Sequence, residues 1–259
     1  MKKSFFNRQS TAVTALFSGD SIAELVAKAR TAAANGADGI AVDLRTLPPE
    51  FCSVDHLRTV VTSVALPSMF LCYRNSKWFG DDDEARQQCL LNAAEAGAEV
   101  IDVMGDLYDP VPGELTTDIS AVEKQKKLIS EIRARGARVL ISSHRHSLAP
   151  QSAEQIYEAL NIQSERGADI CKLVTNGSTE EAFLEAIRAD MMLSKNFPKP
   201  FIHLTNGKFG TLHRFMGLKL GLAITFGVPG YDLTTYSQPL VKSFATVRDT
   251  IPWDIGDVL

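Results

Sequence analysis

The stretch GADICKLVTN, from Gly167 to Asn176, decides the fold prediction because it joins the end of a helix to a buried strand. Gly167 is a residue type that commonly ends helices. The run from Ile170 to Val174 is apolar except for one lysine, Lys172. Continuous apolar runs are typical of parallel sheets whose two faces are both covered by helices. The stretch therefore predicts an α/β protein with an amine placed inside its sheet.

The same pattern repeats along the chain in both directions. With Ile170–Thr175, seven further runs predict strands: Thr11–Phe17, Gly39–Leu44, Ser68–Arg74, Glu99–Gly105, Arg138–His144, Phe201–Asn206 and Ala223–Val228. A helical pattern follows each of them. Eight strand–helix units with short connections predict one domain over residues 1–259, a closed (β/α)8 TIM barrel. A doubly wound open sheet is the alternative, which the lack of a G-x-G-x-x-G motif after the first strand disfavours.

Composition limits the partners and the location. The chain has 259 residues, 45% of them hydrophobic, and a net charge of -4, which argues against nucleic acid or an anionic membrane as a main partner. No apolar run approaches the roughly 18 residues of a membrane span. The four cysteines form no C-x-x-C pair. We therefore expect reduced, buried thiols in a cytoplasmic protein, without a disulfide framework.

Polar residues gather where the predicted strands end, which is where TIM barrels place their chemistry. These residues are Asp43, Arg45, Arg74, His144, His146, Lys172, Lys208, Arg214, Thr234, Ser237 and Gln238. Several have a structural alternative. Arg45 and Arg74 would serve equally well in surface ion pairs, and a lone histidine at a strand end is often structural. A purely structural role is least favourable for Lys172. Its charge would escape burial only if the side chain pointed outward to solvent.

The set of residue types points to one kind of chemistry. Burial disfavours the charged form of an amine, and an uncharged lysine attacks a carbonyl to form a Schiff base. A nearby histidine can take a proton from the adjacent carbon and return it to a leaving group. Arginines bind carboxylates through paired hydrogen bonds. The sequence thus predicts imine chemistry on a small carboxylated keto substrate. It predicts no cofactor and no metal site, since no H-x-x-H motif or carboxylate cluster of metal-site spacing is present.

These residues lie in motifs that resemble type I 3-dehydroquinate dehydratase, the Schiff-base enzyme of the shikimate and quinate pathways. The motifs are VLISSH, GADICKLV, GKFGTLHRFMG, AITFG followed by TTYSQ, VDLR and YRNSK, and their order spans nearly the whole chain. The resemblance implies that Lys172 forms the imine and that His144 is the general acid and base. It implies a substrate-binding set of Asp43, Arg45, Arg74, Arg214, Thr234 and Gln238. It also implies a homodimer.

Three positions depart from the family pattern. Asp43, Trp78 and Met104 stand where the family usually has glutamates, and the glutamate at the second position would orient the histidine. Loss of that carboxylate should lower the basicity of the imidazole and leave its orientation less firmly fixed. Two explanations are open. A nearby acid such as Asp81 or Asp102 compensates, or the pocket has drifted toward another substrate.

Three functions are compatible with these residues. The first is a lyase that dehydrates 3-dehydroquinate to 3-dehydroshikimate. The second is a Schiff-base dehydratase or aldolase that acts on a different carboxylated keto-polyol. The third is a barrel that binds a carboxylated ligand without turnover, which leaves the pairing of an amine with an imidazole unexplained.

Overall fold

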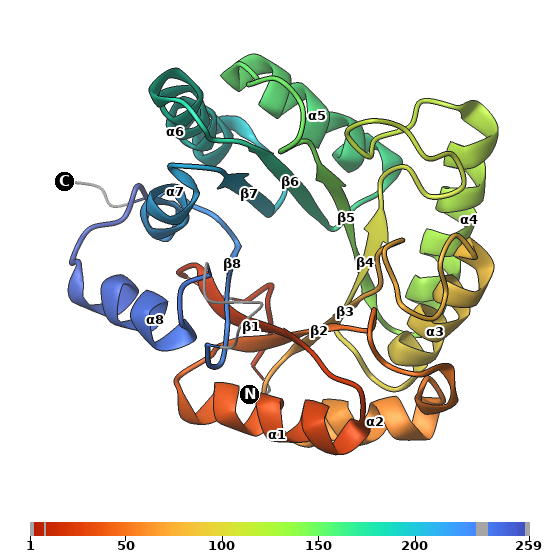
Figure 1. Cartoon of the computed structure of the whole chain (residues 1–259). Coiled ribbons are helices and arrows are strands. Elements are labelled where there is room, and N and C mark those ends of the chain that lie inside the picture. Colours follow the sequence, from red (N-terminus) through yellow and green to blue (C-terminus); the bar gives the residue numbers. More distant parts are fainter. Residues whose placement is uncertain (1–2, 8, 232–237, 257–259) are drawn as a thin grey trace.

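The computed structural model describes residues 3–7, 9–231 and 238–256, and within them eight strands form a ring surrounded by helices (Figure 1). The strands are β1 (Ala12–Ser18), β2 (Gly39–Asp43), β3 (Ser68–Leu71), β4 (Val100–Met104), β5 (Arg138–His144), β6 (Ile170–Asn176), β7 (Phe201–Asn206) and β8 (Ile224–Gly227). The helices are α1 (Ile22–Ala34), α2 (Val54–Thr62), α3 (Asp83–Glu95), α4 (Ile119–Ala134), α5 (Ala153–Arg166), α6 (Glu180–Asn196), α7 (Gly210–Gly217) and α8 (Val241–Thr250), with a 3-10 turn η1 (Pro49–Phe51) before α2.

The strands form one parallel sheet in the order β7-β6-β5-β4-β3-β2-β1-β8. The amide of Ala223, just before β8, donates to the carbonyl of Phe201 on β7 at 2.8 Å and joins the two ends of the sheet. The sheet therefore forms a nearly closed barrel, and the predicted (β/α)8 TIM barrel is confirmed.

Local signals in the sequence place the helices against this barrel. Ser152 and Gln155 form a reciprocal capping box at the start of α5, which satisfies backbone amides that the helix leaves free. The helix ends at Gly167, whose φ of 112° is a left-handed conformation that glycine adopts without strain. The chain then enters β6, where Ile170 to Thr175 are all buried. The opening stretch is thus the predicted helix-to-strand connection.

The strand predictions hold, with one difference that affects the site. The observed bounds of β5 and β7 are those expected from the sequence. β3 ends at Leu71, three residues before the expected end at Arg74. A turn in which the amide of Ser76 donates to the carbonyl of Tyr73 at 3.2 Å replaces the end of the strand. Tyr73 and Arg74 therefore lie in the connection between β3 and α3.

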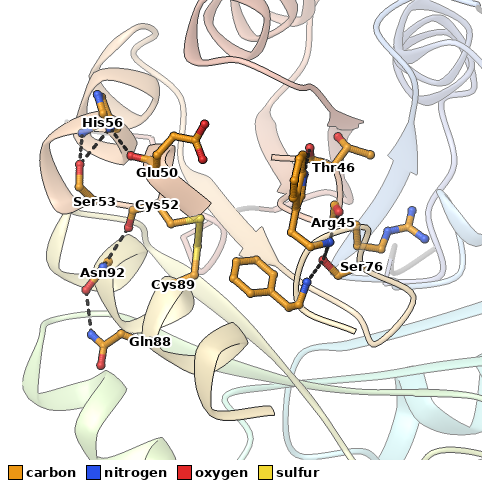
Figure 2. Close-up of a disulfide and its surroundings, with 12 residues drawn as sticks. Arg45, Thr46, Glu50, Cys52, Ser53, His56, Ser76, Gln88, Cys89 and Asn92 are labelled. Atoms are coloured by element: carbon orange, nitrogen blue, oxygen red, sulfur yellow. Dashed lines mark hydrogen bonds between the residues drawn. A yellow bond between two sulfur atoms is a disulfide. The ribbon is translucent and has the colours of Figure 1, made fainter. Parts of the chain in front are cut away.

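The cysteines only partly match the expectation. Cys72 and Cys171 are free and buried, as predicted. Cys52 and Cys89 instead form a disulfide, with their Cα atoms 5.3 Å apart, that ties the residue after η1 to α3 (Figure 2). The prediction of reduced thiols is therefore wrong for this pair. The two cysteines are 37 positions apart in the sequence, and only the packing of adjacent helical segments of the barrel brings them together. No short cysteine motif could therefore predict the bond. In the described part of the chain, no helix is both long enough and apolar enough to span a membrane.

Candidate active site

Lys172 points into the barrel rather than outward. It lies on β6 opposite Ser142 of β5 and Ile202 of β7, and it is 6% exposed. Its Nζ donates to the hydroxyl of Tyr73 at 2.6 Å and lies 3.4 Å from the carboxylate of Asp102. The buried amine is thus paired on one side and reaches a cavity on the other.

That cavity has a volume of about 540 Å³ and opens at the carboxyl ends of the strands. Its polar lining is Asp43, Arg45, Tyr73, Arg74, Asn75, Asp102, Glu114, His144, His146, Lys172, Asn206, Arg214 and Gln238. Seven of the eight residues predicted for the site therefore line one cavity. The eighth, Thr234, lies outside the described residues.

Tyr73 is a site residue that the sequence pattern did not reveal. Its hydroxyl donates to Asp102 Oδ2 at 2.9 Å and accepts from Lys172, so it links the amine to the carboxylate. The other oxygen of Asp102 accepts from the hydroxyl of Ser142 at 2.5 Å. Burial, together with the charge of Asp102, raises the pKa of Tyr73 well above its usual value. The phenol therefore stays protonated near neutral pH and can donate.

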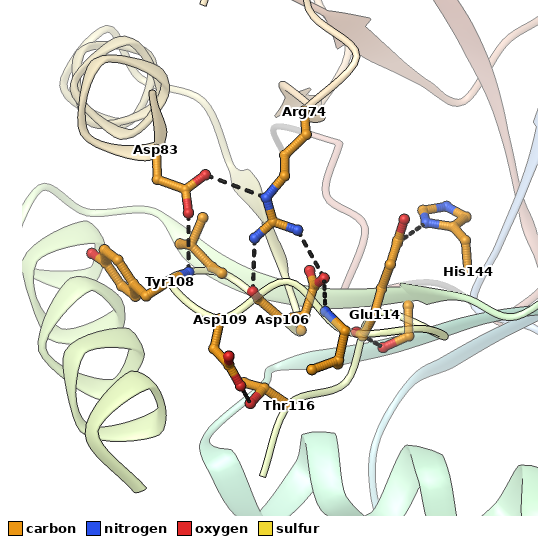
Figure 3. Close-up of polar contacts among 12 residues, drawn as sticks. Arg74, Asp83, Asp106, Tyr108, Asp109, Glu114, Thr116 and His144 are labelled. Carbon is orange, nitrogen blue, oxygen red and sulfur yellow. Dashed lines mark hydrogen bonds and ion pairs between the residues drawn. The ribbon is translucent and has the colours of Figure 1, made fainter. Parts of the chain in front are cut away.

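His144 has a carboxylate partner that the sequence did not predict. Its Nδ1 lies 2.5 Å from Glu114 Oε2, in the connection between β4 and α4 (Figure 3). Burial alone would raise the pKa of Glu114, but the hydrogen bond and the charge of His144 outweigh it and lower the pKa. The carboxylate is thus ionised and fixes the orientation of the ring, leaving Nε2 for the cavity.

The loop that carries Glu114 is itself held in place. Gly113 and Glu114 both have left-handed backbone conformations, with φ values of 84° and 52°. The carbonyl of Glu114 accepts from the hydroxyl of Ser143 at 2.7 Å, and Ser143 directly precedes the histidine on β5. This arrangement aims the carboxylate at His144. The sequence did not indicate this role for Glu114. It lies in a long connection, where no strand or helix periodicity shows which way a side chain points.

Neither acid proposed to compensate for the lost family glutamate contacts the histidine. Asp81 is exposed, and Asp102 serves Lys172 and Tyr73. Trp78, at the position expected for that glutamate, is 46% exposed, and its indole nitrogen donates to the carbonyl of Thr46 at 2.9 Å. In this chain the carboxylate that contacts His144 is Glu114, in the connection between β4 and α4.

Arg74 reaches the cavity with its guanidinium already paired (Figure 3). It contacts the carboxylate of Asp106 at 2.8 Å and that of Asp83 at 3.5 Å, and it donates to the carbonyl of Asp106 at 2.7 Å. Asp83 also pairs with buried Arg86. This network leaves Arg74 little capacity to bind a second anion.

Arg214 is in the opposite situation. Its Nη2 donates to the side-chain oxygen of Asn206 at 3.0 Å, and no described carboxylate lies within ion-pair distance. Burial lowers the pKa of Arg214 to about 10, so the guanidinium remains charged at neutral pH. A partly buried, charged guanidinium at the edge of a cavity, with no carboxylate partner among the described residues, is suited to an anionic group of a ligand.

The remaining predicted residues complete the lining. Asp43 and Arg45 form an ion pair at 2.5 Å, and burial raises the pKa of Asp43 against the opposing charge of Arg45. Gln238 lines the cavity, and its side-chain oxygen is buried without a hydrogen-bond partner among the described residues. Met104 lines the same cavity as an apolar residue.

Comparisons with known proteins identify the family. The family model for type I 3-dehydroquinase matches residues 15–250. A 3-dehydroquinate dehydratase of Klebsiella pneumoniae is 28% identical over 170 residues, which cover 64% of this chain and 62% of that protein. A catabolic 3-dehydroquinate dehydratase of Acinetobacter baylyi is 27% identical over 117 residues, covering 45% of this chain and 42% of that protein. The matches thus span less than two thirds of these curated relatives.

Solved structures show the same fold. A 3-dehydroquinate dehydratase from Geobacillus kaustophilus superposes with a TM-score of 0.78 at 14% identity, covering 93% of this chain and 91% of that chain. A type I enzyme from Clostridium difficile with covalently modified comenic acid gives 0.76 at 17% identity, covering 94% and 92%. With a family model that matches nearly the whole barrel, the chain belongs to the type I 3-dehydroquinase family.

Proposed function

We propose that the protein is a Schiff-base dehydratase that converts 3-dehydroquinate to 3-dehydroshikimate, with Lys172 as the imine-forming residue. One observation carries the proposal. A buried lysine amine faces a cavity of about 540 Å³ that also contains an oriented histidine and a guanidinium without a carboxylate partner among the described residues. Membership of the family supports the dehydratase reaction.

The first part of the reaction forms the imine. Lys172 transfers a proton through the Tyr73 hydroxyl toward Asp102, along contacts of 2.6 and 2.9 Å, and the free amine adds to the ring ketone. The resulting carbinolamine loses its oxygen as water, with the Tyr73 hydroxyl as the nearby proton donor. The product is a protonated imine, which withdraws electrons and acidifies the adjacent C–H bond.

The second part eliminates water from the ring. His144 removes the proton on the carbon next to the imine, and the electrons of that bond form an enamine. The hydroxyl on the next carbon then leaves with a proton from His144, and the imine is regenerated in conjugation with the new double bond. Addition of water to the imine carbon releases the product and returns Lys172 as an amine. Arg214 binds the substrate carboxylate throughout.

The test is reductive trapping of the imine. Borohydride added with 3-dehydroquinate should leave a mass adduct on Lys172 and inactivate the enzyme, and Lys172→Ala should remove both the adduct and the turnover. Lys77→Ala, which removes an exposed lysine at the rim, is the matched control and should behave as wild type. More than about a tenth of the wild-type rate in Lys172→Ala, a loss under about 1.4 kcal/mol, contradicts the mechanism.

A Schiff-base enzyme for another carboxylated ketone is the second candidate, favoured by the apolar Met104 in the lining and by the paired state of Arg74. The absorbance of the conjugated product distinguishes the two. An adduct on Lys172 from another keto acid, without turnover of 3-dehydroquinate, supports the second candidate. A panel of keto acids that leaves no adduct at all supports the binding protein instead.

A further inference from the structure

A second cluster of buried ionisable residues lies between the barrel and its helices. It consists of Asp190 on α6, His203 on β7 and His213 on α7, each with a fully buried side chain. The ladder pairs Lys172 with Ile202, so the next residue, His203, faces the helices rather than the cavity. The proposed reaction has no use for this cluster.

The three side chains converge on a small volume. One ligand atom from each lies within 4.8 Å of the others. His203 Nδ1 is 2.6 Å from Asp190 Oδ1, and His213 Nε2 is 3.2 Å from Asp190 Oδ2. The second distance is close to the roughly 3.3 Å between neighbouring ligands around tetrahedral zinc, given metal–ligand bonds of about 2.0–2.1 Å.

Several polar atoms of the cluster have no hydrogen-bond partner among the described residues. Among the described residues, Asp190 Oδ2 and both ring nitrogens of His213 are buried without a hydrogen-bond partner, although Oδ2 and Nε2 face each other at 3.2 Å. Buried polar atoms are almost always paired, so atoms left in this state call for an explanation such as an ion. His203, in contrast, has its second nitrogen, Nε2, 2.9 Å from the hydroxyl of Thr175.

The outer contact of His203 suits a metal ligand. Thr175 places its hydroxyl 2.9 Å from Nε2 of His203, which is the outer hydrogen bond that metal-bound histidines typically make through their other nitrogen.

We propose that Asp190, His203 and His213 bind a divalent transition metal ion, with zinc as the best match to one carboxylate and two imidazoles. The site is closed to solvent, so the ion enters as the chain folds and its role is structural. His213 directly precedes Arg214 on α7, and the ion would therefore fix that helix, and with it the guanidinium, against β7. The proposal stands independently of the reaction at Lys172.

The direct test is the metal content of the intact chain. The protein is produced in medium supplemented with zinc or with cobalt(II), purified without chelators and dialysed, and metal per chain is measured by plasma mass spectrometry and native electrospray. We expect about one ion per chain, and for cobalt the visible ligand-field absorption of a four-coordinate site with nitrogen and oxygen ligands. Asp190→Asn, which keeps the shape of the side chain, should lower the metal content at least tenfold.

His56→Gln is the matched control, because His56 is exposed and lies far along the chain from the cluster. It should retain the wild-type metal content. Wild-type protein with less than about a tenth of an ion per chain in both media overturns the proposal and leaves a metal-free network of one carboxylate and two imidazoles. Equal metal content in wild type and Asp190→Asn overturns it as well. If Asp190→Asn does not fold, the wild-type measurement alone decides.

Discussion

The two sides of the cavity differ in how their charges are arranged. The acidic wall, from β2 to the β4–α4 connection, carries Asp43, Tyr73, Asp102 and Glu114, and each of these side chains contacts another ionisable group. The Arg214 wall, from β7 to the start of α8, carries Asn206, Arg214 and Gln238, and none of the described lining residues there is acidic.

From this difference in charge partners we expect the two walls to have separate tasks. Groups that already exchange hydrogen bonds with Lys172 or His144 are placed to move protons, and removing them should lower kcat. Among the described residues, the Arg214 guanidinium has only the Asn206 amide as a partner, so we expect it to bind an anion in both ground and transition states, and weakening it should raise KM. The contrast between Arg74 and Arg214 fits this division, because Arg74 is paired with acids and Arg214 has no acidic partner within the described part of the chain.

The largest expected effect comes from the acidic wall. Tyr73→Phe removes the hydroxyl between Lys172 and Asp102 while keeping the ring, so we expect kcat to fall about 10²-fold or more, with KM changed little. Single-turnover trapping with borohydride should show that imine formation is the slowed step. Tyr108→Phe is the control, because Tyr108 bonds to Gln87 away from the cavity. A change in KM without a change in kcat would mean that Tyr73 binds substrate. It would contradict the assignment of proton transfer to the acidic wall.

The second effect comes from the Arg214 wall. Arg214→Lys keeps the positive charge but loses the planar pair of donors, so we expect KM to rise about 10- to 100-fold, roughly 1.4–2.7 kcal/mol, with kcat nearly retained. Steady-state kinetics on the carboxylated substrate measure both constants.

Arg74→Lys is the matched control for that substitution. Because Arg74 spans Asp83 and Asp106, its replacement should lower the unfolding temperature and change KM by less than about threefold. Equal KM effects in the two variants would mean that both arginines contact the substrate.

The smallest effect concerns Glu114. Glu114→Gln should lower kcat about tenfold, since the amide holds the imidazole less firmly and lacks the charge. The pKa of Glu114 is lower in the folded protein than in the unfolded chain. Its hydrogen bond with His144 therefore adds stability above the ordinary pKa of about 4.3, and this is lost as the pH falls through the lower folded value.

Chemical denaturation at pH 7 and near pH 3 tests this sign. The variant should be less stable than wild type at pH 7, by under about 1 kcal/mol because the pair is partly exposed, and the difference should shrink in acid. A difference that grows in acid would mean that the Glu114 carboxylate is not stabilised by its contact with His144.

The sequence revealed the parts of the site that lie on strands. Lys172 and His144 sit in β6 and β5, where the apolar pattern fixes both the strand and its end, and the barrel brings all strand ends to one mouth. Tyr73 and Glu114 lie in connections, where no periodicity shows which way a side chain points. The pairing of Arg74 was hidden for the same reason, since its acids come from α3 and from the β4–α4 connection.

The buried cluster around Asp190 was hidden for a different reason. Its members come from two helices and a strand, so their spacing matches no metal motif, and the sequence-based prediction of no metal site rested on motifs alone. Only the packing of α6 and α7 against β7 shows that the three side chains meet.

The Cys52–Cys89 bond has a consequence for the unfolded chain. The loop it closes, with a sequence separation of 37, contains β3 together with Tyr73 and Arg74. Such a crosslink lowers the conformational entropy of the denatured ensemble by an amount worth roughly 4 kcal/mol for a loop of this length. We therefore expect reduction to lower the unfolding temperature while leaving kcat unchanged. The redox state of the surroundings would then set how stable the fold is, and not how fast it turns over substrate.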